Sequence, residues 1–308
     1  MKLFKPFYFF ILISTLSLGQ STIISEEILI KNDSIELPGT LSFSNEKSPL
    51  IIWVHGSGNV NRNGNQKGVN INANYIKQFR DSINNHNIAF YSYDKRSSNL
   101  NNIRFLKNTI FEDFVIDLKK VILYFKENYQ FSKIILVGHS QGSLVALLAS
   151  ENIDKYISIG GVSSTFDTFV INEYNKVNSE YGIKVSSQFK ELKETGTIQE
   201  VDPLIAHLVS KPNQPFILSW MKYNPIEEIK KLTIPILVIN GISDLQVPIE
   251  NAQALKDENK LAKIVLIDSM NHVLKIVKNT MENQQSYFSE SFPLSTKLIE
   301  SIVAFIKE

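Results

Sequence analysis

Residues 134–150 read IILVGHSQGSLVALLAS, and this stretch decides the fold. It opens with a short apolar run that is typical of a buried strand, and small and apolar residues typical of a helix follow Ser140. Between the two stands the pattern Gly-x-Ser-x-Gly, in which Gly138 and Gly142 flank Ser140. A serine in a tight turn between a strand and a helix forms a nucleophile elbow, and the two glycines give the room that this turn requires. We therefore expect the Ser140 hydroxyl to be exposed at the C-terminal edge of a sheet; the alternative is an ordinary glycine-rich turn.

Apolar runs and helical patterns alternate along the rest of the chain. The expected strands span residues 23–30, 35–43, 50–54, 88–93, 134–137, 156–162, 235–239 and 264–267. The expected helices span residues 72–85, 105–128, 140–150 and 294–306. Near-continuous apolar strands that alternate with helices indicate a mostly parallel sheet that is covered on both faces. The sequence thus predicts an α/β protein with a central sheet of about eight strands.

One long segment interrupts this alternation. Between residues 162 and 235 there is no strand signal, but helical patterns occur around residues 168–179, 186–195 and 203–210. A structureless loop of that length inside a compact domain would be unusual. We therefore expect a core domain made of residues 21–164 and 231–308, with residues 165–230 inserted as a helical lid.

The composition excludes several classes of protein. The 308 residues include 32 basic and 31 acidic side chains, and the formal net charge of only +1 argues against a nucleic-acid-binding surface. Apolar residues make up 43% of the chain, which is enough for a full core and too many for a disordered protein. The chain has no cysteine, so it can have neither a thiol nucleophile nor a disulfide.

The first twenty residues predict a signal peptide. Lys2 and Lys5 precede an apolar run over residues 6–19, and polar residues follow it. This run is shorter than the ~20 residues that a membrane-spanning helix needs. We expect cleavage near Gly19 or Gln20, export to the periplasm or the cell exterior, and no stable membrane span in the mature chain. The alternative is a retained N-terminal anchor.

A glycine-rich turn, His-Gly-Ser-Gly at residues 55–58, directly follows the expected strand at 50–54. Such a turn can aim a backbone N–H into a site, and an acyl-transfer enzyme needs two such donors to stabilise the oxyanion. We assign these donors to the N–H groups of Ser57 and Gln141. The side chain of Ser57 is a rival nucleophile, although no helix follows it at once. His55 is expected to brace the loop, and a role as catalytic base is the alternative.

A serine hydroxyl needs a base that removes its proton. Of the five histidines, His272 is the candidate because it stands in a loop just after the last expected strand. His139 adjoins Ser140 but is expected to point away from it, and His86 is expected on the solvated surface. His207 lies on an expected lid helix, where substrate contact is an alternative role.

The base in turn needs an acid that orients it, and this acid is expected between the serine and the histidine in chain order. Asp244 lies in the loop that follows the expected strand at 235–239. Asp268 is the competitor, but it is only four residues from His272 and is therefore too close in the chain to orient it easily.

Several longer stretches carry a family resemblance. They read HGSGNVNRNGN at 55–65, YDKR at 93–96, VGHSQGSLVALLAS at 137–150, PFILSWMKYNP at 215–225, IPILVINGISDLQVP at 234–248 and SMNHVLK at 269–275. With these stretches the chain resembles the α/β-hydrolases, and most closely the secreted bacterial hydrolases of the serine-aminopeptidase-like and dienelactone-hydrolase-like group, often described as acyl esterases. The resemblance implies the α/β-hydrolase fold with a helical lid, a triad of Ser140, Asp244 and His272, and Ser57 and Gln141 as oxyanion-hole donors.

The sequence therefore predicts an exported serine hydrolase that cleaves carboxylic esters of small molecules through an acyl-enzyme, without a metal or an organic cofactor. The nearest alternative is a peptidase acting on small peptides, because the same triad cleaves amides. A binding protein without catalytic activity is a third interpretation. Residues 215–225 return the chain toward the strand before Asp244, so Phe216 and Trp220 are the expected substrate contacts. After YDKR the resembling group continues with a glycine-rich turn that this chain lacks, which leaves its substrate preference open.

Overall fold

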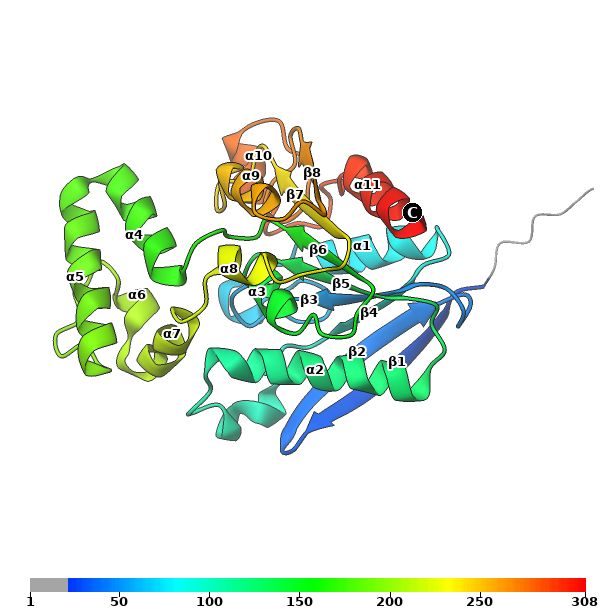
Figure 1. Cartoon of the computed structure of the whole chain (residues 1–308), viewed down its shortest axis with the longest axis horizontal. Coiled ribbons are helices and arrows are strands. Elements are labelled where there is room, and N and C mark those ends of the chain that lie inside the picture. Colours follow the sequence, from blue (N-terminus) through cyan, green and yellow to red (C-terminus); the bar gives the residue numbers. More distant parts are fainter. Residues whose placement is uncertain (1–21) are drawn as a thin grey trace, which may run out of the picture.

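An eight-stranded sheet runs through the centre of the protein in the computed structural model, which describes residues 22–308 (Figure 1). The strands are β1 (Ile24–Asn32), β2 (Ile35–Phe43), β3 (Leu50–Val54), β4 (Ala89–Tyr93), β5 (Ile134–His139), β6 (Lys155–Ile159), β7 (Ile236–Gly241) and β8 (Ala262–Ile267). They lie in the order β1-β2-β4-β3-β5-β6-β7-β8. β2 is antiparallel to both β1 and β4, and all the other neighbours are parallel. The predicted, mostly parallel sheet of eight strands is thus confirmed. The predicted signal peptide lies outside the described residues.

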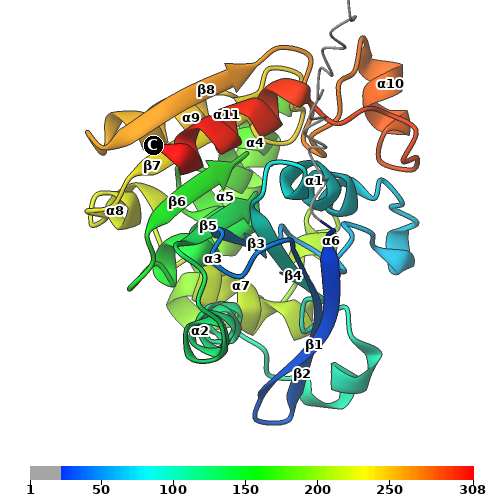
Figure 2. The same ribbon diagram turned by 90° about the vertical axis from the view of Figure 1, so that its right-hand side faces the viewer.

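Helices cover both faces of the sheet, which explains why its central strands are almost continuously apolar. One face packs on α1 (Tyr75–Asn84) and α11 (Thr296–Lys307). The other face packs on α2 (Phe111–Asn128), α3 (Gln141–Leu148), α8 (Pro225–Ile229) and α9 (Glu250–Asp257). In Figure 2, α1 and α11 lie on one side of β3 and β5, and α2 lies on the other.

Between β6 and β7 the chain forms a helical insertion that projects from the body at the left of Figure 1. It contains α4 (Phe166–Val177), α5 (Ser179–Thr195), α6 (Ala206–Val209) and α7 (Gln214–Trp220). These helices have a hydrophobic cluster of their own, separate from the two clusters that pack on the sheet, with Val185, Phe189 and Leu192 of α5 at most 1% exposed. α4 and α5 pack side by side as a helical hairpin. A further short helix, α10 (Thr280–Gln285), lies between β8 and α11.

Several predicted boundaries were wrong for identifiable reasons. The helix expected from residue 105 begins at Phe111, because the Asp113 carboxylate accepts a hydrogen bond from the Ile110 N–H (2.8 Å) and caps the helix there. A 3-10 helix, Leu100–Phe105, precedes it. The strand expected to reach residue 162 ends at Ile159, because Gly160 has a φ of 57° that breaks the extended backbone.

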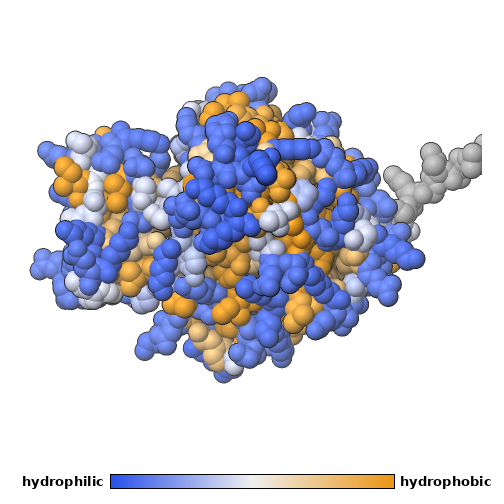
Figure 3. Space-filling model, viewed as in Figure 1, coloured by the Kyte–Doolittle hydropathy of each residue, from blue (hydrophilic) through white to orange (hydrophobic). Residues whose placement is uncertain are grey.

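The face seen in Figure 3 is mostly hydrophilic, with apolar side chains scattered between polar ones. Within residues 22–308, no helix combines the length and the hydropathy that crossing a membrane requires.

A buried ion pair fixes the loop that follows β4. The Arg96 guanidinium donates from Nε to Oδ2 of Asp117 (2.7 Å) and from Nη2 to Oδ1 (2.8 Å), and these side chains are only 5% and 2% exposed. The Asn32 side chain donates a further hydrogen bond to Asp117 (2.8 Å). The pair therefore joins the loop after β4 to α2 and to the end of β1.

Replacement of Arg96 by methionine would leave the Asp117 carboxylate buried without its cation. Breaking a buried ion pair from one side costs about 3–5 kcal/mol, so we expect Arg96→Met to lower the free energy of unfolding by about that much in urea titrations. Lys77→Met is the control, because the pair of Lys77 with Asp81 is half exposed and its loss should cost less than about 0.5 kcal/mol. Equal losses in the two variants would contradict this role of Arg96.

Candidate active site

Ser140 occupies a strained turn between β5 and α3. Its φ is 53° and its ψ is −122°, a backbone conformation that residues with a side chain rarely adopt. The Ser140 N–H donates to the Ile159 carbonyl of the neighbouring strand (2.9 Å), which holds the turn in place. A Cβ on Gly138 would lie 2.5 Å from the Gly142 carbonyl oxygen, and a Cβ on Gly142 would lie 2.5 Å from the His55 carbonyl oxygen. Side chains at either position would therefore clash with backbone, as the sequence pattern predicts.

Asp244 and His272 form a buried pair at the same edge of the sheet. His272 Nδ1 lies 2.7 Å from Asp244 Oδ2, and the two side chains are 5% and 2% exposed. The other carboxylate oxygen accepts from the N–H groups of Gln246 (2.8 Å) and Val247 (2.9 Å). Burial by itself raises the pKa of Asp244, but the charge of His272 and these hydrogen bonds bring the pKa below its ordinary value. Since an ionised carboxylate only accepts, Nδ1 of His272 carries the proton and Nε2 is left as the basic nitrogen.

Gly160 lies against this pair, and sequence reasoning missed it. A Cβ at this glycine would lie 3.3 Å from Asp244 Oδ2 and 3.4 Å from His272 Nδ1. Its positive φ would also strain any other residue. The absence of a side chain at Gly160 therefore lets the Asp244–His272 pair pack on the end of β6.

His139 connects the turn at Ser140 with the loop of His272, a contact that the sequence did not reveal. His139 Nε2 donates to the His272 carbonyl (2.8 Å), and the two imidazole rings are 4.7 Å apart. Burial, with a smaller contribution from His272, lowers the pKa of His139 to about 3, so its ring is neutral. His139 thus places the backbone of His272 beside the residue that precedes Ser140. Within residues 22–308, the Ser140 hydroxyl itself makes no hydrogen bond, which leaves it available to a substrate.

The other candidate side chains lie elsewhere. Asp268 is exposed, and the carboxylate that contacts His272 is that of Asp244. His86 and His207 are both exposed. His55 is buried, and its Nε2 donates to the Tyr93 carbonyl, which braces the end of β3 against the end of β4.

Ser57 and Gln141 lie beside Ser140 in the wall of one cavity. The loop after β3 passes close to the nucleophile, since a Cβ on Gly56 would be 3.2 Å from the Cβ of Ser140. Ser57 follows Gly56 directly. Gln141 is the first residue of α3, so its N–H has no partner within the helix. The structure therefore brings both predicted oxyanion donors to the position of Ser140.

The cavity beside Ser140 has a volume of about 290 Å³ and runs between the sheet edge and the insertion. Its apolar wall consists of Leu144, Val162, Phe166, Phe169, Val170, Leu208, Trp220, Pro225 and Val247. Its polar side chains are those of Ser57, Ser140, Gln141, Ser164 and Gln246. Within the described chain, no acidic or basic side chain lines it. No group of three histidine, aspartate or glutamate side chains in residues 22–308 is placed to bind a metal ion.

Of the two predicted substrate contacts, Trp220 lines the cavity and Phe216 does not. The Trp220 ring stacks on Phe166 (4.3 Å between centroids) and on Phe111 of α2 (5.3 Å). Phe216 packs edge-on against Phe114 of α2 (5.4 Å) and against Trp220 (6.0 Å). The structure thus gives Phe216 a packing role behind Trp220 instead of a place in the cavity wall.

Comparisons with known proteins identify the family of this chain. The BD-FAE family model matches residues 40–259. Est1E from Butyrivibrio proteoclasticus has a similar structure (TM-score 0.57, 17% identity), with 92% of this chain and 99% of that chain covered. The Pyrococcus furiosus esterase Pf2001 is also similar (TM-score 0.58, 15% identity, 92% and 91% covered). For the Pyrococcus horikoshii acylaminoacyl peptidase the TM-score is 0.56 at 17% identity, with 94% of this chain and 42% of the peptidase covered. A search of curated protein sequences found no match.

The structural similarities, at such low identity, establish a shared fold. The match to the family model shows the family as well as the fold, because it extends from within β2 to just beyond α9 and covers well over half of the chain. It includes the turn of Ser140, the insertion and the loop of Asp244. The chain therefore belongs to the BD-FAE family and is a member of the α/β-hydrolase superfamily.

Proposed function

We propose that this protein is a serine hydrolase that cleaves carboxylic esters of small molecules through an acyl-enzyme on Ser140. The observation that carries the proposal is the strained turn that places Ser140 in the cavity wall, directly after His139, whose ring lies against that of His272 in the buried Asp244–His272 pair. The names of similar structures support it, since Est1E binds ferulic acid in one solved structure and Pf2001 is described as an esterase.

In the proposed reaction the ester carbonyl enters the cavity beside Ser140. His272 Nε2 takes the proton of the Ser140 hydroxyl as its oxygen attacks the carbonyl carbon, and Asp244 stabilises the imidazolium that forms. The negative charge on the carbonyl oxygen is stabilised by the N–H groups of Ser57 and Gln141. His272 then protonates the leaving alcohol, and a water molecule activated by the same histidine releases the acid.

The proposed role of residues 165–230 is that of a lid. Six members of the cavity wall belong to this segment: Phe166, Phe169, Val170, Leu208, Trp220 and Pro225. A largely apolar wall suits an acyl or aryl group, which gains binding energy by leaving water.

A peptidase is the second candidate, supported by the similarity to an acylaminoacyl peptidase. An aminopeptidase binds the charged α-amino group of its substrate, for which a carboxylate in the cavity is the natural partner. Within the described chain, no carboxylate lines this cavity. We therefore favour esters over the substrates of an aminopeptidase. A panel of p-nitrophenyl esters and aminoacyl p-nitroanilides separates the two, and turnover of the anilides alone would overturn the ester proposal.

Ser140→Ala tests the nucleophile. The change removes one hydroxyl that makes no hydrogen bond within residues 22–308, so the melting temperature should stay near that of the wild type. Loss of the serine in such a triad costs about 10⁶-fold in kcat, because its members act as one unit. Ser150→Ala, just beyond the other end of α3, is the control and should keep wild-type turnover. If the Ser140 variant retained a tenth of the wild-type rate, Ser140 would not be the nucleophile.

Asp244→Asn tests the acid. Asparagine keeps an oxygen for the N–H groups of Gln246 and Val247 but favours the wrong tautomer of His272, so we expect kcat for p-nitrophenyl esters to fall by about 10⁴-fold with little change in stability. Asp268→Asn is the matched control at an exposed position and should change kcat by less than about threefold. If Asp268→Asn lowered kcat more than Asp244→Asn, the acid of the triad would be Asp268.

Trp220→Ala tests the cavity wall. Removing the indole enlarges the cavity, so we expect longer acyl chains to gain in kcat/KM relative to acetate, while fluorophosphonate labelling of Ser140 persists. Binding energy from such a remote group should affect kcat as well as KM. Phe216→Ala removes packing behind Trp220. It should lower the melting temperature and change the ranking of acyl chain lengths by kcat/KM less than Trp220→Ala does. An unchanged ranking in Trp220→Ala, with only a lower melting temperature, would contradict the proposed role.

A further inference from the structure

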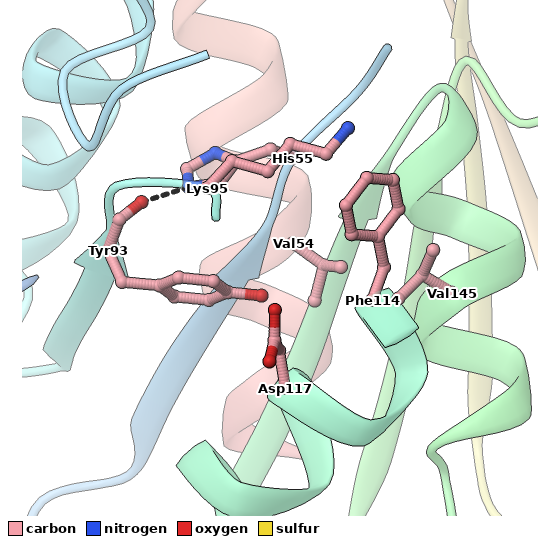
Figure 4. A pocket seen from close by; sticks show the side chains of 7 residues that line it. All are labelled: Val54, His55, Tyr93, Lys95, Phe114, Asp117 and Val145. Carbon is pink, nitrogen blue, oxygen red and sulfur yellow. Dashed lines mark hydrogen bonds between the residues drawn. The ribbon is translucent and has the colours of Figure 1, made fainter. Parts of the chain in front are cut away.

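Lys95 is a buried lysine that the reaction scheme above does not use. It lies just after β4, is 6% exposed, and has no carboxylate within 4.0 Å in the described part of the chain. Its Nζ donates to the Gly56 carbonyl oxygen (2.8 Å) and to Gln141 Oε1 (2.7 Å). The ammonium also lies 4.3 Å from the centroid of the Phe114 ring, toward which the side chain reaches in Figure 4. Burying an ammonium group without a carboxylate costs free energy, so the burial of Lys95 between these two acceptors requires a physical explanation.

The first acceptor belongs to one of the proposed oxyanion donors. The Gly56 carbonyl and the Ser57 N–H are the two ends of a single peptide group. No peptide bond in the described chain is cis, so this group is planar and its N–H points away from its C=O. Lys95 therefore holds the carbonyl end while the N–H end faces the opposite way, and Ser57 lies with Ser140 in the wall of the cavity. A cation on the carbonyl also polarises the peptide group and makes its N–H a stronger donor.

The second acceptor belongs to the other donor. Gln141 contributes its backbone N–H to the proposed oxyanion hole, and its side-chain oxygen is held by the same ammonium. One side chain from the end of β4 thus connects the loop after β3 with the first residue of α3. This connection fixes the position of the Ser57 N–H relative to the Gln141 N–H.

Lys95 cannot itself contact a substrate from where it lies. The space beside it is a void of about 10 Å³ lined by Val54, His55, Tyr93, Lys95, Phe114, Asp117 and Val145, room for at most about one water molecule. Figure 4 shows these side chains enclosing it. Lys95 is absent from the wall of the 290 Å³ cavity beside Ser140.

The neighbouring His55 does not compete for the same acceptors. It donates to the Tyr93 carbonyl, and burial lowers its pKa to about 4, so it is neutral beside Lys95. Burial likewise lowers the pKa of Lys95 to about 7. Both hydrogen bonds survive in either protonation state, because even a neutral amine carries two N–H groups.

We propose that Lys95 is a positioning residue that fixes the N–H groups of Ser57 and Gln141 as the oxyanion hole. This inference rests on the proposed esterase function, and it adds a residue to which neither the sequence motifs nor the triad geometry assigns a role.

Lys95→Met tests the inference, because methionine fills a similar volume and removes the ammonium. With p-nitrophenyl acetate, we expect kcat to fall about 10- to 100-fold, below the 10²–10³-fold cost of deleting an oxyanion donor outright. KM should stay within about threefold, since the hole acts on the transition state. Lys155→Met is the matched control. Lys155 is also 6% exposed and donates to a backbone carbonyl, that of Phe305. However, it is the first residue of β6 and so lies at the amino end of its strand, away from the site at the carboxyl ends. The Lys155→Met variant should be less stable than the wild type but should keep the wild-type kcat.

The outcomes separate the inference from the function on which it rests. An active wild type with a folded Lys95→Met that keeps more than half of the wild-type kcat would overturn the inference alone, as would an equal loss of kcat in Lys155→Met. A wild type that hydrolyses no ester would overturn the proposed function and the inference together. If Lys95→Met does not fold, Gln141→Met takes its place: it keeps both N–H donors, removes the side-chain acceptor of Lys95 and changes one side chain of the cavity wall. We expect its kcat to fall about 3- to 10-fold, and full activity would overturn the inference.

Discussion

The strained backbone at Ser140 is the constraint on which the rest of the site depends. A residue with a side chain at a φ of 53° costs energy, and the surrounding structure has to hold it there. It does so by packing the start of α3 so closely against the end of β3 that residue 142 has to be glycine, and residue 138 has to be glycine because it faces the backbone of Gly142 and Ser143. The close approach of strand and helix fixes the position of the hydroxyl. It also brings the loop after β3 to the same place.

The site is then assembled from the carboxyl ends of parallel strands, which meet at one edge of the sheet. β3, β4, β5, β6, β7 and β8 each end next to a residue of the site, in order Gly56, Lys95, Ser140, Gly160, Asp244 and His272. Buried polar groups join neighbouring loops across this edge: His139 to the loop of His272, and Lys95 to two loops at once. In both of these contacts the buried donor has a buried acceptor, which makes the connection between the loops rigid. The insertion adds the apolar wall.

Much of this could be predicted from the sequence, and the remainder has a physical explanation. Central strands are apolar because both faces are covered, and the turn at Ser140 needs glycines at fixed positions, so both leave local signals. Asp244 and His272 follow recognisable strands in chain order. Lys95, His139 and Gly160 leave no such signal, because their roles depend on partners that only folding brings near: Gly56 and Gln141, the His272 carbonyl, and the Asp244–His272 pair. The short helices α7, α8, α9 and α10 were missed because five to eight residues show too little of the helical period.

The central claim is that Ser140 carries the acyl group during turnover, and trapping that intermediate tests it most directly. The protein is mixed with a p-nitrophenyl ester, quenched in acid within the first turnover, digested and analysed by mass spectrometry. The account predicts a burst of about one p-nitrophenol per chain. It also predicts an acyl group on the peptide that contains Ser140. An acyl group on Ser57, or hydrolysis with no acylated peptide at all, would contradict it.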